Sequence, residues 1–507
     1  MRDYDSSHSL GLDDDAAGDG IINALVHRAF GWAAKWDGAY FTAIAHGAGW
    51  CPDGRGLELG YDMEHHHAFF PLLPALVAAL GGVGHLLGLP RSAAVILAGV
   101  VTSNVAFVLS AVALFRYGST VLARPGQPIP EQAAVAAMLF CINPASVFMS
   151  AIYTESVFAL LSISGMLLLH KPAAKRWGWR WWASALLFSG CAATRSNGVL
   201  NCGYAVFEVL HGPVVAPWVR CGRSHVGLPR SGWAQLCGEL ARLVGYVSLV
   251  VMPLALFQRY VVLLTPCPPA RFCSLGRRPG IRFCASAAHR IHTRLNPSRI
   301  GARGGRRGTT RTFSSATGMW CVATAALART IPAQILDFAL QAPLQYYELK
   351  QLPNFLLAAP MLALSASGIA NYAAADPLRF ATLGFASSGA AGRGTTQWLY
   401  ETNQRLLPHV YLWAFLALVA TVVMHVQVAT RFLASCPVVY WWVAHRSCGC
   451  APASPGPRKR RAGRSQSPEG RETGGRRHGA KWVALTCYFL SYLVVGCALF
   501  PNYYPFT

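Results

Sequence analysis

Long apolar stretches recur along this chain of 507 residues, and shorter polar segments separate them. A membrane-spanning helix needs roughly 20 mostly apolar residues to cross a hydrocarbon core of about 30 Å. The stretches of this kind lie near residues 68–89, 93–115, 132–150, 152–170, 182–203, 243–265, 353–372, 408–428 and 481–500. A weaker stretch lies near 318–340, and residues 432–445 either dip into the membrane or cross it. The pattern predicts an all-α polytopic membrane protein with about 8 to 11 transmembrane helices.

Composition places the chain in the same class. Hydrophobic residues make up 53% of it and charged residues only 13%, and its mean hydropathy is +0.33. These values lie outside the range of ordinary soluble domains. The cysteines are scattered without a repeated spacing, so no disulfide framework is predicted.

The net charge of +23 is concentrated in two segments. Residues 271–311 hold eleven Arg and no acidic residue, and residues 446–481 carry a net charge of +8. Both segments are rich in Gly, Pro, Ser and Ala, a composition typical of disordered inserts. Basic loops beside membrane helices can also rest on anionic lipid headgroups. No nucleic-acid readout module accompanies the arginines, so we predict no nucleic-acid partner.

The first candidate for chemistry is Asp37, an acidic residue that lies between Trp36 and Tyr40 on a polar segment leading into apolar sequence. Charged side chains near hydrocarbon are costly and are usually kept for a function or a pairing. This arrangement would let a carboxylate at the membrane surface reach a lipid-linked substrate. The structural alternative is a solvated acidic loop with the aromatic belt that Trp and Tyr form at membrane interfaces.

Further polar groups mark the ends of other apolar stretches. Tyr153 and Glu155 lie where one such stretch ends and the next begins, and Arg195 lies late in another. The guanidinium of Arg195 would either pair with Glu155 or hold a phosphate bidentately. Lys350 and Arg405 are each candidates for a phosphate contact or for an interface anchor. Adjacent histidines at 65–67 cannot comfortably face one ion, so no metal site is predicted.

Several motifs, taken in chain order, resemble one family. They are Trp36-Asp37-Gly38, Ala68-Phe69-Phe70-Pro71-Leu72-Leu73-Pro74, Asn143-Pro144 with Tyr153-Thr154-Glu155, Arg195-Ser196-Asn197-Gly198, the block from Tyr347 to Ala358, the block from His425 to Leu433, and the ending from Pro501 to Thr507. Together they resemble the GPI mannosyltransferase 2 (PIG-V) family. Each motif is weak alone, but their shared order covers most of the chain.

The resemblance implies a glycosyltransferase of GT-C architecture in the endoplasmic reticulum membrane. Such an enzyme would transfer mannose from dolichyl phosphate mannose to the first mannose of the GPI lipid, in α-1,6 linkage. The donor is β-linked and the product α-linked, so the anomeric centre inverts. Beyond this lipid-linked donor no cofactor is expected, and a small membrane-protein partner subunit is a further expectation.

The resemblance also suggests roles for individual residues. Asp37 matches the acidic residue of the first lumenal loop, which serves as base, and Glu64 is the second carboxylate of that loop. The residues expected to bind the substrates are Trp36, Tyr153, Glu155, Arg195, Asn197, Lys350, Gln351, Asn354, Arg405 and His409.

The predicted organisation follows from these assignments. It comprises a polar N-terminal segment (1–34), a lumenal catalytic loop (35–67), membrane helices (68–265), a basic insert (266–317), membrane helices with lumenal loops (318–445), a basic disordered loop (446–480), and a C-terminal transmembrane helix with its tail (481–507). The family has a span before the stretch that Asp3–Leu10 resembles, so we expect this chain to lack its first helix.

Other functions stay open. A transporter would also explain apolar spans and intramembrane charges, but no inverted repeat is visible. Another mannosyltransferase that uses dolichyl phosphate mannose is a closer alternative. An inactive family member is the third, because the sequence from 266 to about 342 barely resembles the family.

Overall fold

The computed structural model describes residues 20–50, 57–61, 64–123, 130–170, 178–212, 230–264, 352–387, 400, 403–422, 426–447 and 469–502. The chain divides into two compact units. The first comprises Met1–Phe257 and Gln341–Thr507, and the second comprises Gln258–Leu340. In the second unit, the described part is the helical segment 258–264.

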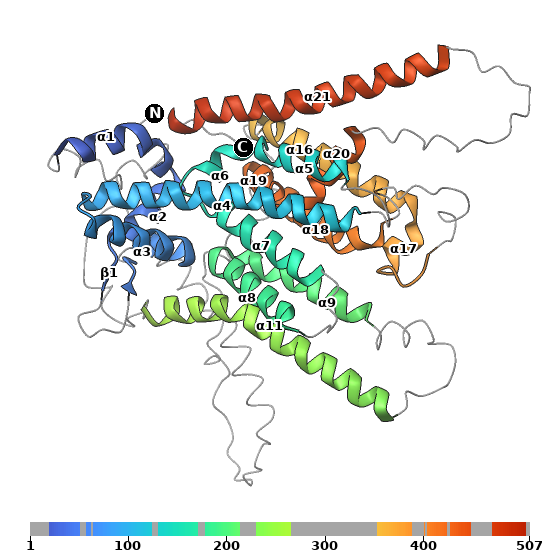
Figure 1. The fold of residues 1–507 in the computed structure, drawn as a ribbon, viewed down its shortest axis with the longest axis horizontal. Helices are drawn as coiled ribbons and strands as arrows, with labels where there is room; N and C mark the ends of the chain where they lie inside the picture. Colours follow the sequence, from blue (N-terminus) through green and yellow to red (C-terminus); the bar gives the residue numbers. More distant parts are fainter. Residues whose placement is uncertain are drawn as a thin grey trace, which may run out of the picture. The chain divides into compact units, whose positions relative to one another are not determined.

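The described part of the chain is nearly all helical (Figure 1). Its first half contains α1 (Gly20–Phe30), η3 (Gly31–Ala34), α2 (Asp37–His46), η4 (Glu64–Ala68), α3 (Leu72–Leu86), α4 (Arg91–Val121), α5 (Glu131–Cys141), α6 (Ser146–Ser150), α7 (Thr154–His170), α8 (Trp179–Thr194), η5 (Ser196–Asn201), α9 (Cys202–Leu210) and α11 (Arg230–Leu264). A two-stranded antiparallel sheet joins β1 (Gly49–Trp50) to β2 (Leu57–Glu58), with Gly49 opposite Glu58.

The second half continues in the same way. It contains α16 (Leu352–Ala375), α17 (Pro377–Ala381), η9 (Gln404–Leu406), α18 (Leu407–Val422), η10 (Val426–Val428), α19 (Ala429–Leu433), α20 (Pro437–Ser447), α21 (Glu469–Leu499) and η11 (Phe500–Asn502).

Five described helical segments are long and apolar enough to cross a membrane. They are Arg91–Val121, Trp233–Val261, Leu352–Ala375, Gln404–Val422 and Val483–Asn502. The shorter apolar helices α3, α5 and α7 also fall on predicted spans. The prediction of an all-α polytopic membrane protein is therefore confirmed. The weak stretch at 318–340 lies outside the described residues.

Two predicted spans are interrupted. In the stretch 132–150, α5 ends at Cys141 and the chain turns at Asn143, whose Oδ1 accepts a hydrogen bond from the backbone N–H of Ala145 at 2.8 Å. In the stretch 182–203, α8 ends at Thr194, and Arg195 has extended backbone angles. Both interruptions occur where a polar side chain enters an apolar run. They bring polar groups to the start of α7 and to the end of α8.

The long helix α4 packs against α3, α5 and α7, and α7 packs in turn against α8 (Figure 1). Small residues allow this close packing, as is usual between membrane helices. A Cβ atom added to Gly165 on α7 would lie 2.3 Å from the ring of Phe188 on α8. Polar side chains also link the helices: the Asn104 amide on α4 donates to the carbonyl of Ser150 at 3.0 Å.

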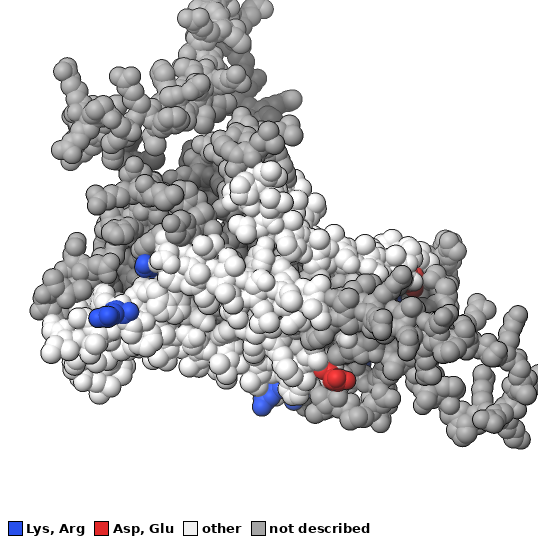
Figure 2. Space-filling model, turned by 90° about the horizontal axis from the view of Figure 1, so that it is seen from above, with Lys and Arg blue, Asp and Glu red and all other residues white. Residues whose placement is uncertain are grey.

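Much of the described surface is apolar. Figure 2 shows a face on which uncharged side chains prevail among the described residues. Large apolar side chains such as Leu86, Val108, Leu186 and Val494 are exposed. An exposed apolar surface of this extent is expected where a protein contacts lipid, because the lipid tails are as apolar as the side chains that face them.

Candidate active site

Asp37 is the first residue of α2, so the segment predicted as a loop contains a helix at its most important position. The chain enters this helix through Trp36, whose φ of 56° lies in the left-handed region that side chains rarely adopt. The backbone N–H of Gly38 donates to the carbonyl of Lys35 at 3.0 Å and closes the turn. The Asp37 side chain is thereby placed at a sharp reversal of the chain.

The residue that follows Asp37 is a glycine for a steric reason. A Cβ atom at position 38 would lie 2.8 Å from the carbonyl oxygen of Ala33 and 3.4 Å from that of Ile152. The Ala33 carbonyl also accepts a hydrogen bond from the Ile152 N–H at 2.9 Å. Gly38 therefore lets α2 approach the segment that leads into α7, and this explains the third residue of the Trp-Asp-Gly motif.

The Tyr153 side chain also fixes the start of α2. Its hydroxyl accepts a hydrogen bond from the backbone N–H of Asp37 at 3.0 Å. The Tyr153 ring is buried against the ring of Phe148, with centroids 5.3 Å apart. An N–H at a helix start has no partner within its own helix, and here a side chain from a distant part of the chain satisfies it.

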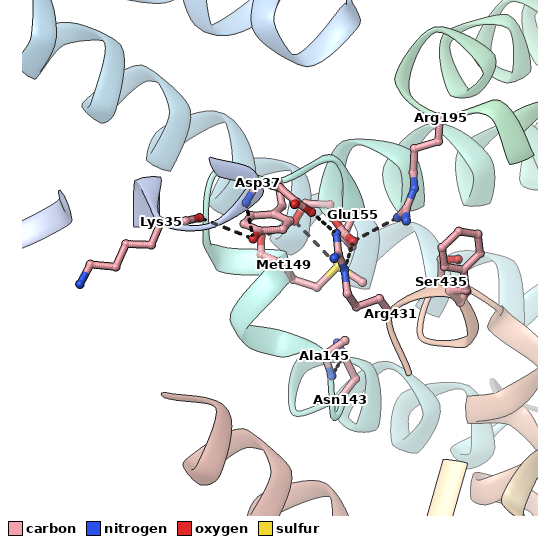
Figure 3. Close-up of polar contacts among 12 residues, drawn as sticks. Lys35, Asp37, Asn143, Ala145, Met149, Glu155, Arg195, Arg431 and Ser435 are labelled. Carbon is pink, nitrogen blue, oxygen red and sulfur yellow. Dashed lines mark hydrogen bonds and ion pairs between the residues drawn. The ribbon is translucent and has the colours of Figure 1, made fainter. Parts of the chain in front are cut away.

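One guanidinium joins the two carboxylates of the site. Nη2 of Arg431 lies 3.1 Å from Oδ2 of Asp37, and its Nε lies 2.7 Å from Oε1 of Glu155. Figure 3 shows Arg431 between the two carboxylates. Arg431 belongs to the short helix α19, outside the five candidate spans. Burial opposes its charge, but the Glu155 and Asp37 carboxylates outweigh this effect and raise the pKa of Arg431 above its ordinary value.

A second arginine completes the network. Nη1 of Arg195 lies 3.2 Å from the same Oε1 of Glu155, so the pairing that was one of the two alternatives for Arg195 is present. The Glu155 side chain is fully buried at 0% exposure, whereas that of Asp37 is 40% exposed. The two carboxylates and two guanidinium groups balance in charge, as a buried ionic cluster requires. Within this cluster, Asp37 is the carboxylate that a substrate can reach.

Aromatic rings surround both guanidinium groups. Cζ of Arg431 lies 4.7 Å from the centroid of the Phe148 ring and 4.9 Å from that of Tyr153. Cζ of Arg195 lies 4.7 Å from the centroid of the Phe432 ring. Cations over aromatic faces are stabilised electrostatically, and the rings hold the planar groups in place.

The turn that carries Arg195 also depends on a glycine. Gly198 donates its N–H to the Arg195 carbonyl at 2.9 Å, and a Cβ there would lie 2.3 Å from the carbonyl carbon of Cys191. The chain can therefore fold back directly onto the end of α8. Asn197 lies half-buried in the same turn, in η5.

The structure brings together Trp36, Asp37, Tyr153, Glu155 and Arg195 from the predicted set. Glu64 lies in η4, but its side chain is outside the described residues, as are Lys350 and Gln351. Asn354 lies in the first turn of α16 and is half-buried.

Arg405 and His409 lie in a different place. They line a cavity of about 460 Å³ together with Tyr117, His170 and Tyr204. The His409 ring forms two hydrogen bonds with tyrosine hydroxyls. Its Nε2 lies 2.8 Å from the hydroxyl of Tyr117, and its Nδ1 lies 3.0 Å from that of Tyr204.

This cavity is remote from Asp37. Glu155 is the second residue of α7 and His170 its last, and at 1.5 Å per residue they are separated by about 22 Å. The structure therefore does not bring Arg405 and His409 to the carboxylate cluster. In the part of the chain that the structure describes, no three His, Cys, Asp or Glu side chains converge as a metal site would require.

Arg431 is the member of the cluster that the sequence analysis did not select. A signal was present, because Arg431 lies within one of the resembling motifs, His425–Leu433, and is a lone charge in that motif. The sequence did not show which residue Arg431 binds. The interaction with Asp37 joins positions 394 residues apart.

Known proteins resemble this chain over its whole length. The profile of the mannosyltransferase (PIG-V) family matches residues 1–507. GPI alpha-1,6-mannosyltransferase 2 of Mus musculus is 30% identical over 513 residues, which cover 96% of this chain and 90% of the relative. The Homo sapiens protein of the same name is 30% identical over 516 residues, with the same coverage. GPI mannosyltransferase 2 of Drosophila melanogaster is 26% identical over 492 residues, covering 96% and 90%.

Among solved structures, the archaeal oligosaccharyltransferase AglB from Archaeoglobus fulgidus, in complex with an inhibitory peptide and a dolichol-phosphate, is similar with a TM-score of 0.43 and 11% identity. The match covers 90% of this chain and 50% of that one.

Proposed function

Because the chain belongs to the mannosyltransferase (PIG-V) family, we propose that it adds mannose in α-1,6 linkage to the first mannose of the GPI precursor, taking it from dolichyl phosphate mannose with inversion of the anomeric centre. Family membership confirms the sequence-based assignment and the enzyme class, which is that of the glycosyltransferases. The five candidate membrane helices make it a multi-pass membrane protein. Residence in the endoplasmic reticulum is part of the proposal.

One observation carries the mechanism: Asp37 is a partly exposed carboxylate held by an ionic cluster whose other carboxylate, Glu155, is fully buried. A general base must be reachable by the hydroxyl whose proton it takes, and it must be held in a defined orientation. Glu155 fails the first condition because it is fully buried between Arg195 and Arg431. Asp37 meets both conditions.

The proposed reaction is a single displacement. The O6 oxygen of the acceptor mannose forms a bond to C1 of the donor mannose while the bond between C1 and the phosphate oxygen breaks. The electron pair of the broken bond stays on dolichyl phosphate, and the proton of the acceptor hydroxyl passes to the carboxylate of Asp37. Attack from the face opposite the leaving group inverts C1.

The leaving phosphate gains negative charge and needs cations or hydrogen-bond donors. Arg431 and Arg195 are the nearest cations to Asp37 in the cluster, and their side chains are 17% and 13% exposed. We assign Arg431 to the orientation of Asp37 and to the field at the leaving group. Arg195 supports Glu155, which in turn holds Arg431.

Other parts of the substrate sites rest on the sequence. Glu64 stays a candidate catalytic residue that orients Asp37 or the acceptor, and Lys350, Gln351 and Asn354 stay candidates for contacts with the substrates. A small partner subunit in the membrane is also a proposal.

The test is mannosyl transfer in vitro. The full chain, in membranes from cells that lack the second GPI mannosyltransferase, receives a GPI lipid with one mannose and dolichyl phosphate mannose carrying a labelled sugar. We expect one mannose to be added, with a 6-linked first mannose by methylation analysis and an α-anomeric product by NMR. Return of GPI-anchored proteins to the surface of those cells provides the cellular readout.

Each alternative has a distinct outcome. A mannose at another hydroxyl, or on another lipid-linked glycan, would assign the chain to a neighbouring reaction. Transfer absent from a folded, membrane-inserted chain, under conditions in which the mouse relative is active, would identify an inactive family member.

A further inference from the structure

The residue before Asp37 adopts a backbone conformation that needs outside support. Trp36 has φ 56° and ψ −129°, a combination that is unfavourable for a bulky side chain. Such conformations persist only where the surroundings determine them strongly, and they gather at functional sites. The contacts of Trp36 and of its neighbour Lys35 show where this support comes from.

Both side chains bind the same distant turn. Nε1 of Trp36 donates to the carbonyl of Phe500 at 3.2 Å, and Nζ of Lys35 donates to the carbonyl of Pro501. The partners are separated by 464 and 466 positions in the chain. Two consecutive side chains thus bind two consecutive carbonyls of η11.

The position of η11 explains why its carbonyls are free to accept. It directly follows α21, and the last carbonyls of a helical segment lack partners within that segment. The negative end of the helix dipole also lies there, and it favours the ammonium group of Lys35. Backbone carbonyls at this end are therefore good acceptors for one cation and one indole N–H.

A second route leads from the same turn to Asp37. The Phe500 side chain is buried at 1% exposure, with its ring centroid 5.4 Å from that of Phe148 and 5.8 Å from that of Tyr153. Tyr153 is the residue whose hydroxyl accepts the N–H of Asp37. Both the turn before Asp37 and the side chain that binds its backbone therefore rest on Phe500–Asn502.

We propose that η11 is a positioning element of the active site: it holds Lys35, Trp36 and Tyr153 and thereby sets the location of the Asp37 carboxylate. This inference rests on the proposed role of Asp37 as base. It also changes the role predicted for Trp36, whose indole N–H is used within the protein and positions Asp37 instead of binding substrate. A displacement of about 1 Å at a reacting group can lower the rate by about 10²-fold.

The test replaces the donors and measures kcat and KM separately. Trp36→Phe keeps an aromatic ring but removes the N–H, and Lys35→Met keeps the stem but removes the cation. We expect each to lower kcat by roughly 10-fold or more while KM for both substrates stays within about 2-fold. Lys35→Arg, which keeps a cationic donor, should retain most of the activity. Trp233→Phe, at an exposed tryptophan of α11, is the matched control and should leave both constants unchanged.

A double substitution distinguishes the positioning of Asp37 by η11 from a merely structural role of η11. If η11 acts through Asp37, Trp36→Phe should cause no further loss when added to Asp37→Asn. An equal loss in that background would overturn the inference, as would a raised KM with unchanged kcat, which would make Trp36 a substrate contact. Phe500→Ala gives an independent check, because it removes the ring contacts and leaves the carbonyl.

The two proposals fail in different ways. Asp37→Asn at the wild-type rate would contradict the proposed base. An inactive Asp37→Asn enzyme together with fully active Trp36→Phe and Lys35→Met enzymes would overturn only the positioning role of η11. Melting temperature and elution volume in detergent, measured for every variant, establish that the compared proteins are folded.

Discussion

Arg431 binds Asp37 through Nη2 at 3.1 Å while its Nε binds the fully buried Glu155 at 2.7 Å. One planar guanidinium therefore fixes the exposed carboxylate relative to a residue that cannot move without disrupting the core. Arginine suits this task because its donors have a rigid geometry, whereas lysine is a single flexible point charge. The position of the Asp37 carboxylate is thus tied to the ion pair between Arg431 and the buried Glu155.

Asp37→Asn keeps the size of the side chain but removes its basic charge. We expect turnover to fall by roughly 10²-fold or more, because the acceptor hydroxyl loses its base. Stability should change little, since the pair with Arg431 is partly exposed and such pairs contribute about 0–1 kcal/mol. Glu131→Gln, which also replaces a carboxylate with an amide at an exposed helix start, is the control. Turnover within a few-fold of wild type would shift the base assignment to Glu64.

Arg431→Lys retains the charge but cannot serve both carboxylates in one geometry. We expect a folded enzyme with turnover lowered roughly 10-fold or more. Arg431→Met removes the charge beside Glu155 and should also lower the free energy of unfolding, because breaking a buried ion pair costs about 3–5 kcal/mol. Thermal unfolding and turnover, measured together, separate the two effects. Full turnover in Arg431→Lys would show that the position of Asp37 does not depend on the planar fork.

Arg195 and Glu155 form a pair whose coupling can be measured. In a double-mutant cycle of Arg195→Ala and Glu155→Ala, the losses in stability should be strongly non-additive, with a coupling of about 0.5–3 kcal/mol. If the pairing is the main role of Arg195, Arg195→Lys should leave donor affinity unchanged. A large loss of donor affinity in Arg195→Lys would instead indicate a bidentate contact with the phosphate.

Gly38→Ala should lower turnover strongly without any change of charge. The new Cβ would lie 2.8 Å from the Ala33 carbonyl, so α2 must move away and carry Asp37 with it. Gly31→Ala is a matched control in the same segment, because nothing lies within 4 Å of its Cβ position. We expect turnover to fall by about 10²-fold in Gly38→Ala and to remain near wild type in Gly31→Ala. Equal activities would contradict the steric explanation of the Trp-Asp-Gly motif.

The sequence by itself determined the class of the protein. Apolar stretches near the length of a membrane span can be read without knowledge of tertiary contacts, because each helix satisfies its own backbone hydrogen bonds in lipid. Ordered motifs identified the family in the same way. Asp37 could be selected as a candidate because a carboxylate beside apolar sequence is costly wherever the chain folds.

Only the tertiary structure decided which groups act together. The pairing of Asp37 with Arg431 joins residues 394 positions apart, and the support of Trp36 by Phe500 joins residues 464 positions apart. No periodicity or local spacing encodes such contacts. They arise from helix packing, which places Glu155 at one end of α7 and leaves Arg405 and His409 near the other end. Hydrogen bonds and hydrogen-bonded ion pairs form only at about 3 Å, so the partners of a charged side chain are set by where the packed helices bring them.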